Sequence, residues 1–357
     1  MRVVFIGLSI TSSWGNGHAT NYRALSAELH ARGHEVLFCE RDVPWYAAQR
    51  DLPSPGYAEL CLYQNIGELQ RRAHDAVHAA DLVIIGSYVP EGVAVAEWVL
   101  HTATGAVAFY DIDTPVTLAK LARGDHEYIA PWLIPEFDFY LSFTAGPALD
   151  LLQDRYGARR PMAFHCLVDP TAYQPQPGAR RWDLGYLGTY SEDRQPGVEA
   201  LLIAVARAAP ERHFVVAGPQ YPAEVQWPAN VERIEHLPPP EHPAFYAAQR
   251  FTLNITRAEM RRLGWSPSVR LFEAAACRSA IISDRWAGLD DVLVPGREIL
   301  LADTTTEVLQ ALRETAEEAR RALGEAARRR VLAHHTAAHR VDLLERELGA
   351  RAAEVMA

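Results

Sequence analysis

Three side chains in the first third of the sequence have the chemistry to move a proton. His18 ends the loop "SSWGNGH", and Asp111 and Asp113 form the D-x-D of "AFYDID". An imidazole with an ordinary pKa of about 6.5 takes a proton from a hydroxyl near neutral pH, and a carboxylate can orient it or act as the base itself. Two alternatives stay open for the D-x-D, namely oxygen ligands for a divalent cation and a helix cap.

The loop before His18 is the second feature, because its glycines permit close approach of the backbone to a ligand. A helix is predicted near 18–32, and a helix N-terminus favours anionic groups. We expect a flexible segment that faces a ligand, formed by Ser13, Trp14, Gly15, Asn16 and Gly17. Neither G-x-G-x-x-G nor G-x-x-x-x-G-K-[ST] occurs there, which argues against NAD and P-loop sites, although Glu40 stands where a ribose-binding acid would.

Short apolar runs alternate with helical patterns along the chain. The strands and helices that they predict must position His18, Asp111 and Asp113. We expect strands at "RVVFIGLSI", "EVLFCE", "DLVIIGS", "AVAFYDID" and "FYLSFT", then at "DLGYLGTY", "HFVVAGP", "VERIEHL", "RFTLNITR", "SAIISD" and "EILLA". That rhythm predicts an α/β protein with doubly wound parallel sheets, in which ligands meet the carboxyl ends of the strands. The last fifty residues, rich in Ala, Leu, Arg and Glu, are predicted as helices, with His335 and His339 four apart on one of them.

A proline-rich stretch without helical period, "CLVDPTAYQPQPGARRWD", separates the two sets of strands. At 357 residues the chain also exceeds the roughly 250–300 residues at which one hydrophobic core stops growing. We therefore expect a Rossmann-like domain at 1–165, a second at 166–330 and a helical tail at 331–357, with the site in a cleft between the two domains.

Composition narrows the class of protein. The 35 Lys and Arg against 45 Asp and Glu give a net charge of −10, which disfavours a nucleic acid or an anionic membrane as the main partner. The four cysteines lie far apart and form no C-x-x-C pair, so a reducing cytosol fits better than a disulfide framework. The apolar start is too short to span a membrane. These features favour a soluble cytoplasmic enzyme or binding protein and leave its oligomeric state open.

Several segments of the sequence resemble motifs of one superfamily. "GHATNYRALSAELHARGHEV" resembles the first helix of GT-B glycosyltransferases, and "LVDPTAYQP" resembles their hinge at the entry to the donor domain. "YLGTYSEDRQP" resembles the phosphate loop of that domain. The segment near 255–345, with "SPSVRLFEAAACRSAIISD" and "GLDDVLVPGREILLAD", resembles the domain typified by the CgeB-like spore-maturation proteins, which are related to family 4 transferases.

The resemblance implies a GT-B fold with an N-terminal acceptor domain and a C-terminal domain that binds a nucleotide-diphosphate sugar. Arginines would neutralise the diphosphate, and a carboxylate, Glu273, would accept from the ribose hydroxyls. The implied donor-binding residues are Gly188, Thr189, Arg194, Arg257, Ser266, Ser268, Arg270 and Glu273, with Arg257 the weaker of the arginines. The segment 13–17 then becomes the acceptor-side loop.

The sequence departs from the family 4 pattern at one position that bears on the sugar. Eight positions before Glu273, where a first Glu is expected, stands Trp265. In addition, His18 resembles the base of inverting family 1 enzymes, whereas the relatives of the C-terminal half are mostly retaining enzymes, in which a loop histidine touches the sugar. Inversion and retention both stay open.

The expected function is transfer of a sugar from a nucleotide-diphosphate sugar to a hydroxyl of a small-molecule or glycan acceptor. No cofactor is expected, nor a metal ion, because GT-B enzymes generally neutralise the diphosphate with basic residues and helix dipoles. Two alternatives remain: a sugar-nucleotide 2-epimerase of the same fold, and a nucleotide-sugar-binding protein without catalysis.

Overall fold

The computed structural model describes residues 1–356 and divides the chain into two compact units. Unit 1 comprises residues 1–167 and the described residues from 337 onward, and unit 2 comprises Val168–Thr336. The chain therefore enters unit 2 once, at the proline-rich stretch, and returns to unit 1 for its final helix.

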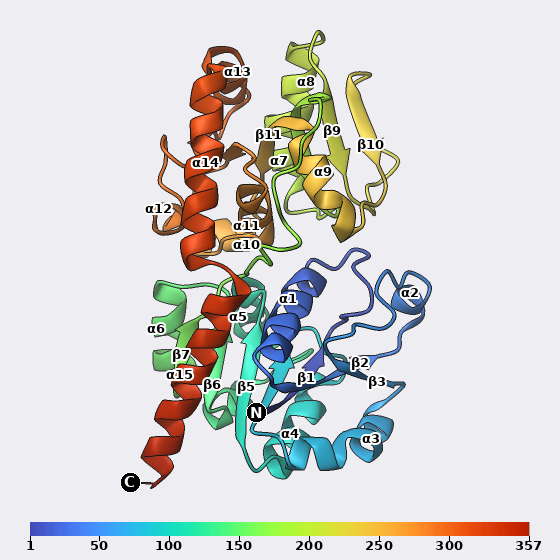
Figure 1. Cartoon of the computed structure of the whole chain (residues 1–357), viewed down its shortest axis with the longest axis vertical. Helices are drawn as coiled ribbons and strands as arrows, with labels where there is room; N and C mark the ends of the chain where they lie inside the picture. Colours follow the sequence, from blue (N-terminus) through green and yellow to red (C-terminus); the bar gives the residue numbers. More distant parts are fainter. Residues whose placement is uncertain (357) are drawn as a thin grey trace. The chain divides into compact units, whose positions relative to one another are not determined.

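Unit 1 is built on a seven-stranded parallel sheet in the order β3-β2-β1-β4-β5-β6-β7 (Figure 1). Its strands are β1 (Arg2–Gly7), β2 (Glu35–Arg41), β3 (Glu59–Tyr63), β4 (Leu82–Gly86), β5 (Ala106–Asp111), β6 (Phe139–Ser142) and β7 (Pro161–Ala163). The central strands β4 and β5 are buried along their whole length, which explains their unbroken apolar runs. The chain builds outward from β1 to β3 and then restarts at β4 on the other side of β1.

The helices of unit 1 are α1 (His18–Ala31), α2 (Pro44–Ala47), α3 (Ile66–His78), α4 (Gly92–Thr102), α5 (Thr114–Ala122), the 3-10 turn η1 (Pro131–Glu136), α6 (Pro147–Tyr156) and α15 (Ala337–Met356). α15 lies beside α1 (Figure 1). Arg32, at the end of α1, donates to Asp342 at 2.7 Å and to Glu345 at 2.8 Å. A helix from the far end of the sequence thus covers the first helix.

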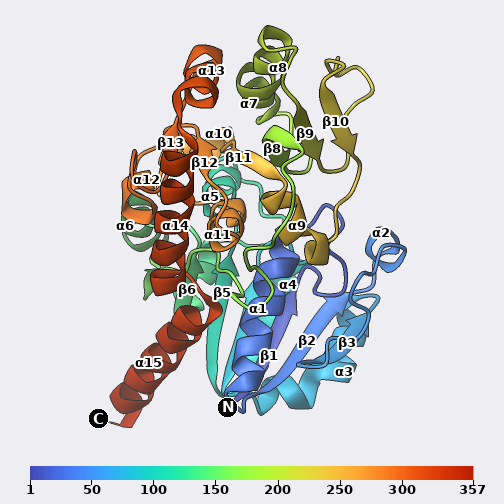
Figure 2. The ribbon, with the colours of Figure 1, turned by 45° about the horizontal axis from the view of Figure 1, so that its top comes forward.

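Unit 2 contains a six-stranded parallel sheet in the order β10-β9-β8-β11-β12-β13 (Figure 2). Its strands are β8 (Trp182–Leu187), β9 (Phe214–Ala217), β10 (Val231–Ile234), β11 (Gln249–Asn254), β12 (Ile281–Ser283) and β13 (Leu300–Leu301). The strand order reverses between β8 and β11, as it does between β1 and β4 in unit 1.

The helices of unit 2 are α7 (Gln195–Val198), the π-helical η2 (Glu199–Ile203), α8 (Ala204–Ala208), the 3-10 turn η3 (Pro239–Glu241), α9 (His242–Ala247), α10 (Ala258–Leu263), α11 (Val269–Ala276), α12 (Leu289–Val292), α13 (Thr305–Glu314) and α14 (Glu317–His334). The helix that follows β8 runs from α7 through η2 to α8 without a break. α14 packs against α11.

The predicted fold class is confirmed, and each of the predicted strands is present. The two strands that the sequence did not reveal, β3 and β7, lie at the two edges of the unit 1 sheet, where short strands carry a weak apolar signal. The placement of His335 and His339 on one helix was wrong, because α14 ends at His334 and α15 begins at Ala337.

Candidate active site

The reversal of strand order in unit 1 gathers three polar side chains from the loops after β1, β4 and β5. His18 is the first residue of α1, and its ring centroid lies 5.7 Å from that of Tyr88. The Tyr88 hydroxyl donates to Asp113 Oδ2 at 2.7 Å. Ligands of doubly wound sheets bind outside the carboxyl ends of the strands at such a reversal. The structure therefore brings His18 and Asp113 into one cluster, through Tyr88.

Tyr88 is a member of this cluster that the sequence did not single out. Its φ of 65° lies in the left-handed region, which is sparsely populated for bulky residues and is often found at functional sites. Its ring also packs on Tyr128, with 4.8 Å between centroids. The backbone strain is thus balanced by contacts that hold the ring beside His18.

Asp111, the other predicted catalytic carboxylate, is fully buried at the end of β5. Its oxygens accept from the Tyr140 hydroxyl at 2.7 Å, the Thr117 hydroxyl at 2.8 Å and the Asp113 amide at 3.2 Å. Burial raises the pKa of Asp111 to about 6, although these donors lower it. Asp111, predicted to take part in proton transfer, instead holds the β5–α5 turn from inside.

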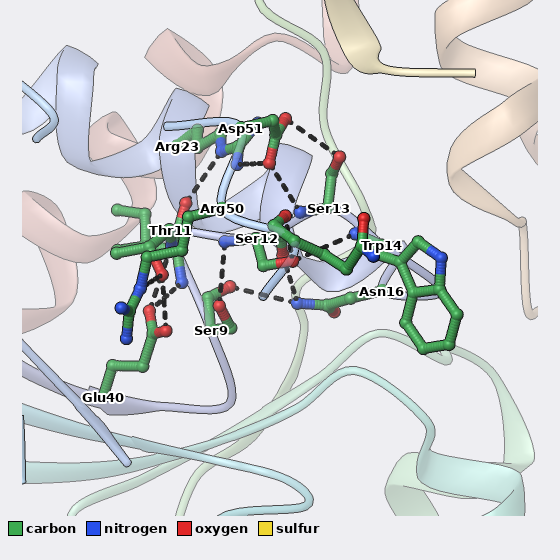
Figure 3. Close-up of polar contacts among 12 residues, drawn as sticks. Ser9, Thr11, Ser12, Ser13, Trp14, Asn16, Arg23, Glu40, Arg50 and Asp51 are labelled. Atoms are coloured by element: carbon green, nitrogen blue, oxygen red, sulfur yellow. Dashed lines mark hydrogen bonds and ion pairs between the residues drawn. The ribbon is translucent and has the colours of Figure 1, made fainter. Parts of the chain in front are cut away.

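The loop between β1 and α1 is anchored at its start by Glu40, which is fully buried (Figure 3). One carboxylate oxygen accepts from the amides of Ile10 and Thr11 at 2.8 and 3.0 Å, and the other accepts from the Thr11 hydroxyl at 2.6 Å. Both oxygens of Glu40 are therefore engaged by the loop. The alternative of a ribose-binding acid at this position does not fit.

The middle of the same loop is tied to Asp51. Ser13 donates to it from its amide and its hydroxyl, and Arg23 adds a bidentate ion pair at 2.9 and 2.8 Å (Figure 3). Burial raises the pKa of Asp51, but the hydrogen bond and charge of Arg23 outweigh it and bring the pKa below its usual value. These contacts hold in one shape a segment that the sequence predicted to be flexible.

The last part of the loop contains Trp14, Gly15, Asn16 and Gly17. Asn16 is buried and donates to the carbonyls of Ser9 and Ser12 at 3.1 Å, while its side-chain oxygen accepts from the His18 amide. The indole of Trp14 projects away from this polar cluster (Figure 3). Gly15 and Gly17 are exposed on either side of Asn16. Asn16 thus fixes the backbone from which His18 starts α1.

In unit 2, the predicted phosphate loop begins at Gly188, directly after β8. A Cβ at this position would lie 2.7 Å from the Tyr186 hydroxyl and 2.9 Å from Arg270 Nη2, so any side chain would displace both groups. Arg270 is buried, donates to the Leu187 carbonyl at 2.5 Å and to Asn254 Oδ1 at 2.8 Å, and lies over the Tyr186 ring. A guanidinium is therefore fixed against the turn at the carboxyl end of β8.

Arg194 approaches the same turn from the residue before α7. Its Nη2 donates to the Thr189 carbonyl at 2.8 Å. Three buried polar atoms here have no hydrogen-bond partner within the described part of the chain: the Tyr186 hydroxyl, Arg194 Nε and Gln195 Oε1. Because a buried polar group without a partner costs free energy, such atoms indicate a ligand or ordered water at this place.

The other predicted donor-side residues divide into two groups. Ser268, before α11, donates to Asn254 Oδ1 at 2.8 Å, which is the oxygen that Arg270 also contacts. Ser266 is fully buried and donates to the Gly264 carbonyl, and Arg257 Nε pairs with Asp193 at 3.2 Å. Ser268 therefore joins the Gly188 cluster, whereas Ser266 and Arg257 shape the adjoining loops.

Glu273, the predicted ribose ligand, lies inside α11 and is buried. Its Oε1 accepts from the Tyr173 hydroxyl at 2.9 Å and its Oε2 from the Tyr246 hydroxyl at 3.1 Å, and His242 lies 3.7 Å away. Burial raises the pKa of both tyrosines. In this arrangement Glu273 ties the proline-rich stretch to α9, and a ribose would have to displace a tyrosine hydroxyl to reach it.

Among residues 1–356, no group of three or more His, Cys, Asp or Glu side chains is arranged to hold a metal ion. No helix among these residues is both long enough and apolar enough to cross a bilayer.

Comparison with known proteins relates part of the chain to a family. Residues 194–346 match the family model described as glycosyl transferase-like. None of the curated proteins compared with the chain matches it. The description names the broad family, and nothing in it singles out the CgeB-like proteins.

Solved structures match over nearly the whole chain at low identity. Sucrose-phosphate synthase from Thermosynechococcus elongatus is 15% identical, with a TM-score of 0.71 over 98% of this chain and 100% of that one. HepE of Anabaena, solved with UDP and glucose, is 13% identical, with a TM-score of 0.72 over 98% and 100%. An α-glucosyltransferase solved with UDP and a 13-mer DNA is 11% identical, with a TM-score of 0.69 over 97% and 99%. Two parallel sheets of seven and six strands and the match to these structures lead to one conclusion: the chain has the GT-B fold, and its residues 194–346 are similar to the glycosyl transferase-like family.

Proposed function

We propose that the chain transfers a sugar from a nucleotide-diphosphate sugar to an acceptor hydroxyl, with unit 2 binding the donor. The observation that carries this proposal is the arrangement around Gly188. Arg194 and Arg270 converge on one turn, and buried polar atoms of Tyr186 and Arg194 lack partners there among the described residues.

The two arginines would stabilise the leaving diphosphate as its negative charge develops. Arg270 is held by the Leu187 carbonyl and Asn254 before any donor binds, so little reorganisation is needed when the glycosidic bond breaks. Arg194 precedes the helix that begins at Gln195, whose N-terminus favours an anion. These groups neutralise a diphosphate without a metal ion, and we propose that transfer is independent of divalent cations.

The donor is proposed to be a UDP-hexose. HepE of Anabaena was solved with UDP-glucose, and the α-glucosyltransferase was solved with UDP-glucose as well. Both share the fold of this chain at low identity, so the support that they give is by analogy.

On the acceptor side, His18 is proposed as the base that removes the proton of the acceptor hydroxyl. Asp113 influences it through the Tyr88 hydroxyl, which donates to Asp113 while the Tyr88 ring lies against the His18 ring. Proton removal by a base at the attacking hydroxyl corresponds to an inverting reaction. The loop 13–17 is proposed to shape the acceptor site, with Trp14 as its apolar surface.

The test has a binding step and a product step. Calorimetry with UDP, ADP, GDP and the matching hexose conjugates should show tightest binding for UDP and UDP-hexose. Incubation of UDP-hexose with a panel of glycan and small-molecule acceptors, followed by mass spectrometry, should show a hexosyl adduct and free UDP.

Three outcomes would contradict the proposal in different ways. If no nucleoside diphosphate binds, the donor site is wrong. If the sugar moiety changes and UDP is released without any acceptor, the 2-epimerase is favoured. If UDP-hexose binds but no acceptor in the panel yields an adduct, the chain acts as a binding protein.

A further inference from the structure

Unit 2 contains a pocket where the strands of its sheet begin, at the opposite end of β8 from Gly188. It has a volume of about 470 Å³, and its lining includes Arg180 and Ser279, which precede β8 and β12, and Gln249, which begins β11. β8 runs for six residues from Trp182 to Leu187, so the pocket and Gly188 are separated by about 20 Å along this strand. The pocket is thus separate from the proposed donor site.

The lining of this pocket is strongly basic. Four arginines line it, and none of its other lining residues, all within the described range, is Asp or Glu. The arginines are Arg180, Arg278, Arg320 and Arg321. Over the whole chain, 45 Asp and Glu outnumber 35 Lys and Arg. A pocket lined by four arginines and no acidic residue therefore departs from the overall composition.

One carboxylate outside the lining fixes three of these guanidinium groups. Glu317 receives two contacts from Arg180 at 2.9 and 2.8 Å, two from Arg320 at 2.9 and 3.0 Å, and one from Arg321 at 2.8 Å. The side chain of Arg320 is only 7% exposed. A guanidinium has five N–H donors, so Glu317 engages a minority of the donors on the three arginines.

The charge of this group is not balanced by Glu317. Three cations share one anion, and Arg278 reaches Glu325 only at 3.5 Å from a largely exposed position. Arg250 adds a further cation whose guanidinium donates to the carbonyls of Leu312 and Thr315. Hydrogen bonds from Arg320, and then from Arg180 and Arg321, hold the pKa of Glu317 far below its usual value, so the carboxylate stays charged. The net charge of the cluster is therefore positive.

We propose that this pocket binds a phosphate-bearing anion, independently of the donor site. Guanidinium groups held in place by a neighbouring carboxylate present their remaining N–H donors in the planar geometry that phosphate oxygens accept. Pro175–Gly178, from the proline-rich stretch, forms one wall of the pocket. An anion in the pocket contacts this segment and holds it in place.

The experiment uses the full-length Arg194→Ala variant, so that phosphate binding at Gly188 is weakened from the start. Inorganic phosphate, pyrophosphate and ribose 5-phosphate are titrated by calorimetry at constant ionic strength in chloride buffer. The proposal expects saturable binding of at least one probe. Inorganic phosphate and pyrophosphate report on a free anion, and ribose 5-phosphate reports on a phosphate ester.

The specificity of this binding is tested by two double variants on that background. Arg278→Gln with Arg321→Gln should weaken binding at least tenfold, and both side chains are more than half exposed, so the fold is expected to persist. Arg313→Gln with Arg329→Gln removes the same charge from exposed positions of α13 and α14 that do not line the pocket, and should leave the affinity unchanged. Absence of binding by all three probes, or equal loss in both double variants, would overturn the proposal.

Discussion

The β1–α1 loop of unit 1 and the β8–α7 turn of unit 2 stand at equivalent places, since each follows the first strand of its sheet. In the first, Glu40 and Asp51 hold the backbone and side chains of the loop, and both oxygens of each carboxylate are engaged. In the second, polar atoms of Tyr186, Arg194 and Gln195 are buried without a partner among the described residues.

The difference shows how two sites of the same topology are prepared in different ways. The contacts of Glu40 and Asp51 that hold the unit 1 loop form within the folded chain and need no ligand. The unit 2 turn keeps unsatisfied donors and acceptors, whose cost is recovered only when a polar group arrives. The first kind of loop suits the positioning of a base, and the second suits binding of a charged donor.

The largest expected effect is on His18. Replacing it with Ala should lower single-turnover transfer about 10²- to 10⁴-fold, the range for loss of a general base, and the wild-type product should be the inverted anomer by NMR. His101→Ala, at an exposed position of α4, is the matched control and should leave the rate unchanged. A product with retained anomeric configuration would contradict the assignment of His18 as a base. The unit 1 loop would then not serve to position a base.

Arg194→Ala should lower kcat about 10²- to 10³-fold and change the donor KM much less, because its charge acts mainly on the leaving diphosphate. Arg207→Ala removes a guanidinium paired with Glu199 on the surface of the same helix and serves as the control. The assay is repeated with EDTA, which should have little effect. Loss of activity in EDTA and its recovery with magnesium or manganese would contradict the arginine assignment.

Glu40→Ala should lower the free energy of unfolding by about 3 kcal/mol or more, because the buried amides of Ile10 and Thr11 lose a charged acceptor. Urea denaturation measures this loss, with Glu97→Ala, on the exposed face of α4, as the control. A loss no larger than that of the control would mean that the loop does not depend on this anchor.

The free energy of unfolding should depend on pH through the carboxyl group of Asp111. Its pKa of about 6 in the folded chain is above the ordinary 3.8, so its contribution to stability is present below about pH 4 and is lost as the pH rises through 6. The difference in unfolding free energy between wild type and Asp111→Asn should fall by about 2–3 kcal/mol between pH 4 and 7. Urea denaturation at several pH values decides this, and a difference that does not vary with pH would exclude the buried titration.

The smallest effect tests the comparison most directly. Tyr186→Phe removes a hydroxyl that has no partner within the described residues, so the stability of the ligand-free protein should be unchanged or slightly higher. Donor affinity should fall about fivefold, the loss of one neutral hydrogen bond of about 1 kcal/mol. Thermal unfolding and calorimetry with UDP give the two readings. A loss of stability with unchanged affinity would reverse the roles assigned to the two loops.

The sequence predicted the fold well because buried parallel strands carry long apolar runs that need no knowledge of their neighbours. It did not reveal β3 and β7, since an edge strand is short and paired on one side only. It also did not reveal the interruption at His335 and Thr336, because the composition of α14 continues into α15. A strand is encoded by its own short segment of sequence. The break between α14 and α15 depends instead on α14 packing in unit 2 and α15 in unit 1.

For the site, sequence motifs identified residues that the structure does gather around Gly188, but they did not distinguish exposure from burial. Asp111 and Glu40 looked like ligand-facing acids, and both prove to be internal anchors. Tyr88 carried no signal, because it is one of 14 tyrosines and reaches His18 only through the pairing of β4 with β1. Contacts between distant strands, which no local pattern encodes, decided these roles.

The return of the chain to unit 1 through α15 has a consequence for synthesis on the ribosome. All of unit 2 is translated before the helix that packs against α1, so unit 1 waits for its last element while unit 2 already has its whole sequence. During that interval the face of α1 that α15 later covers is open to solvent or to a chaperone, and Arg32 still lacks its partners Asp342 and Glu345 of α15. The nascent chain therefore completes its N-terminal half last.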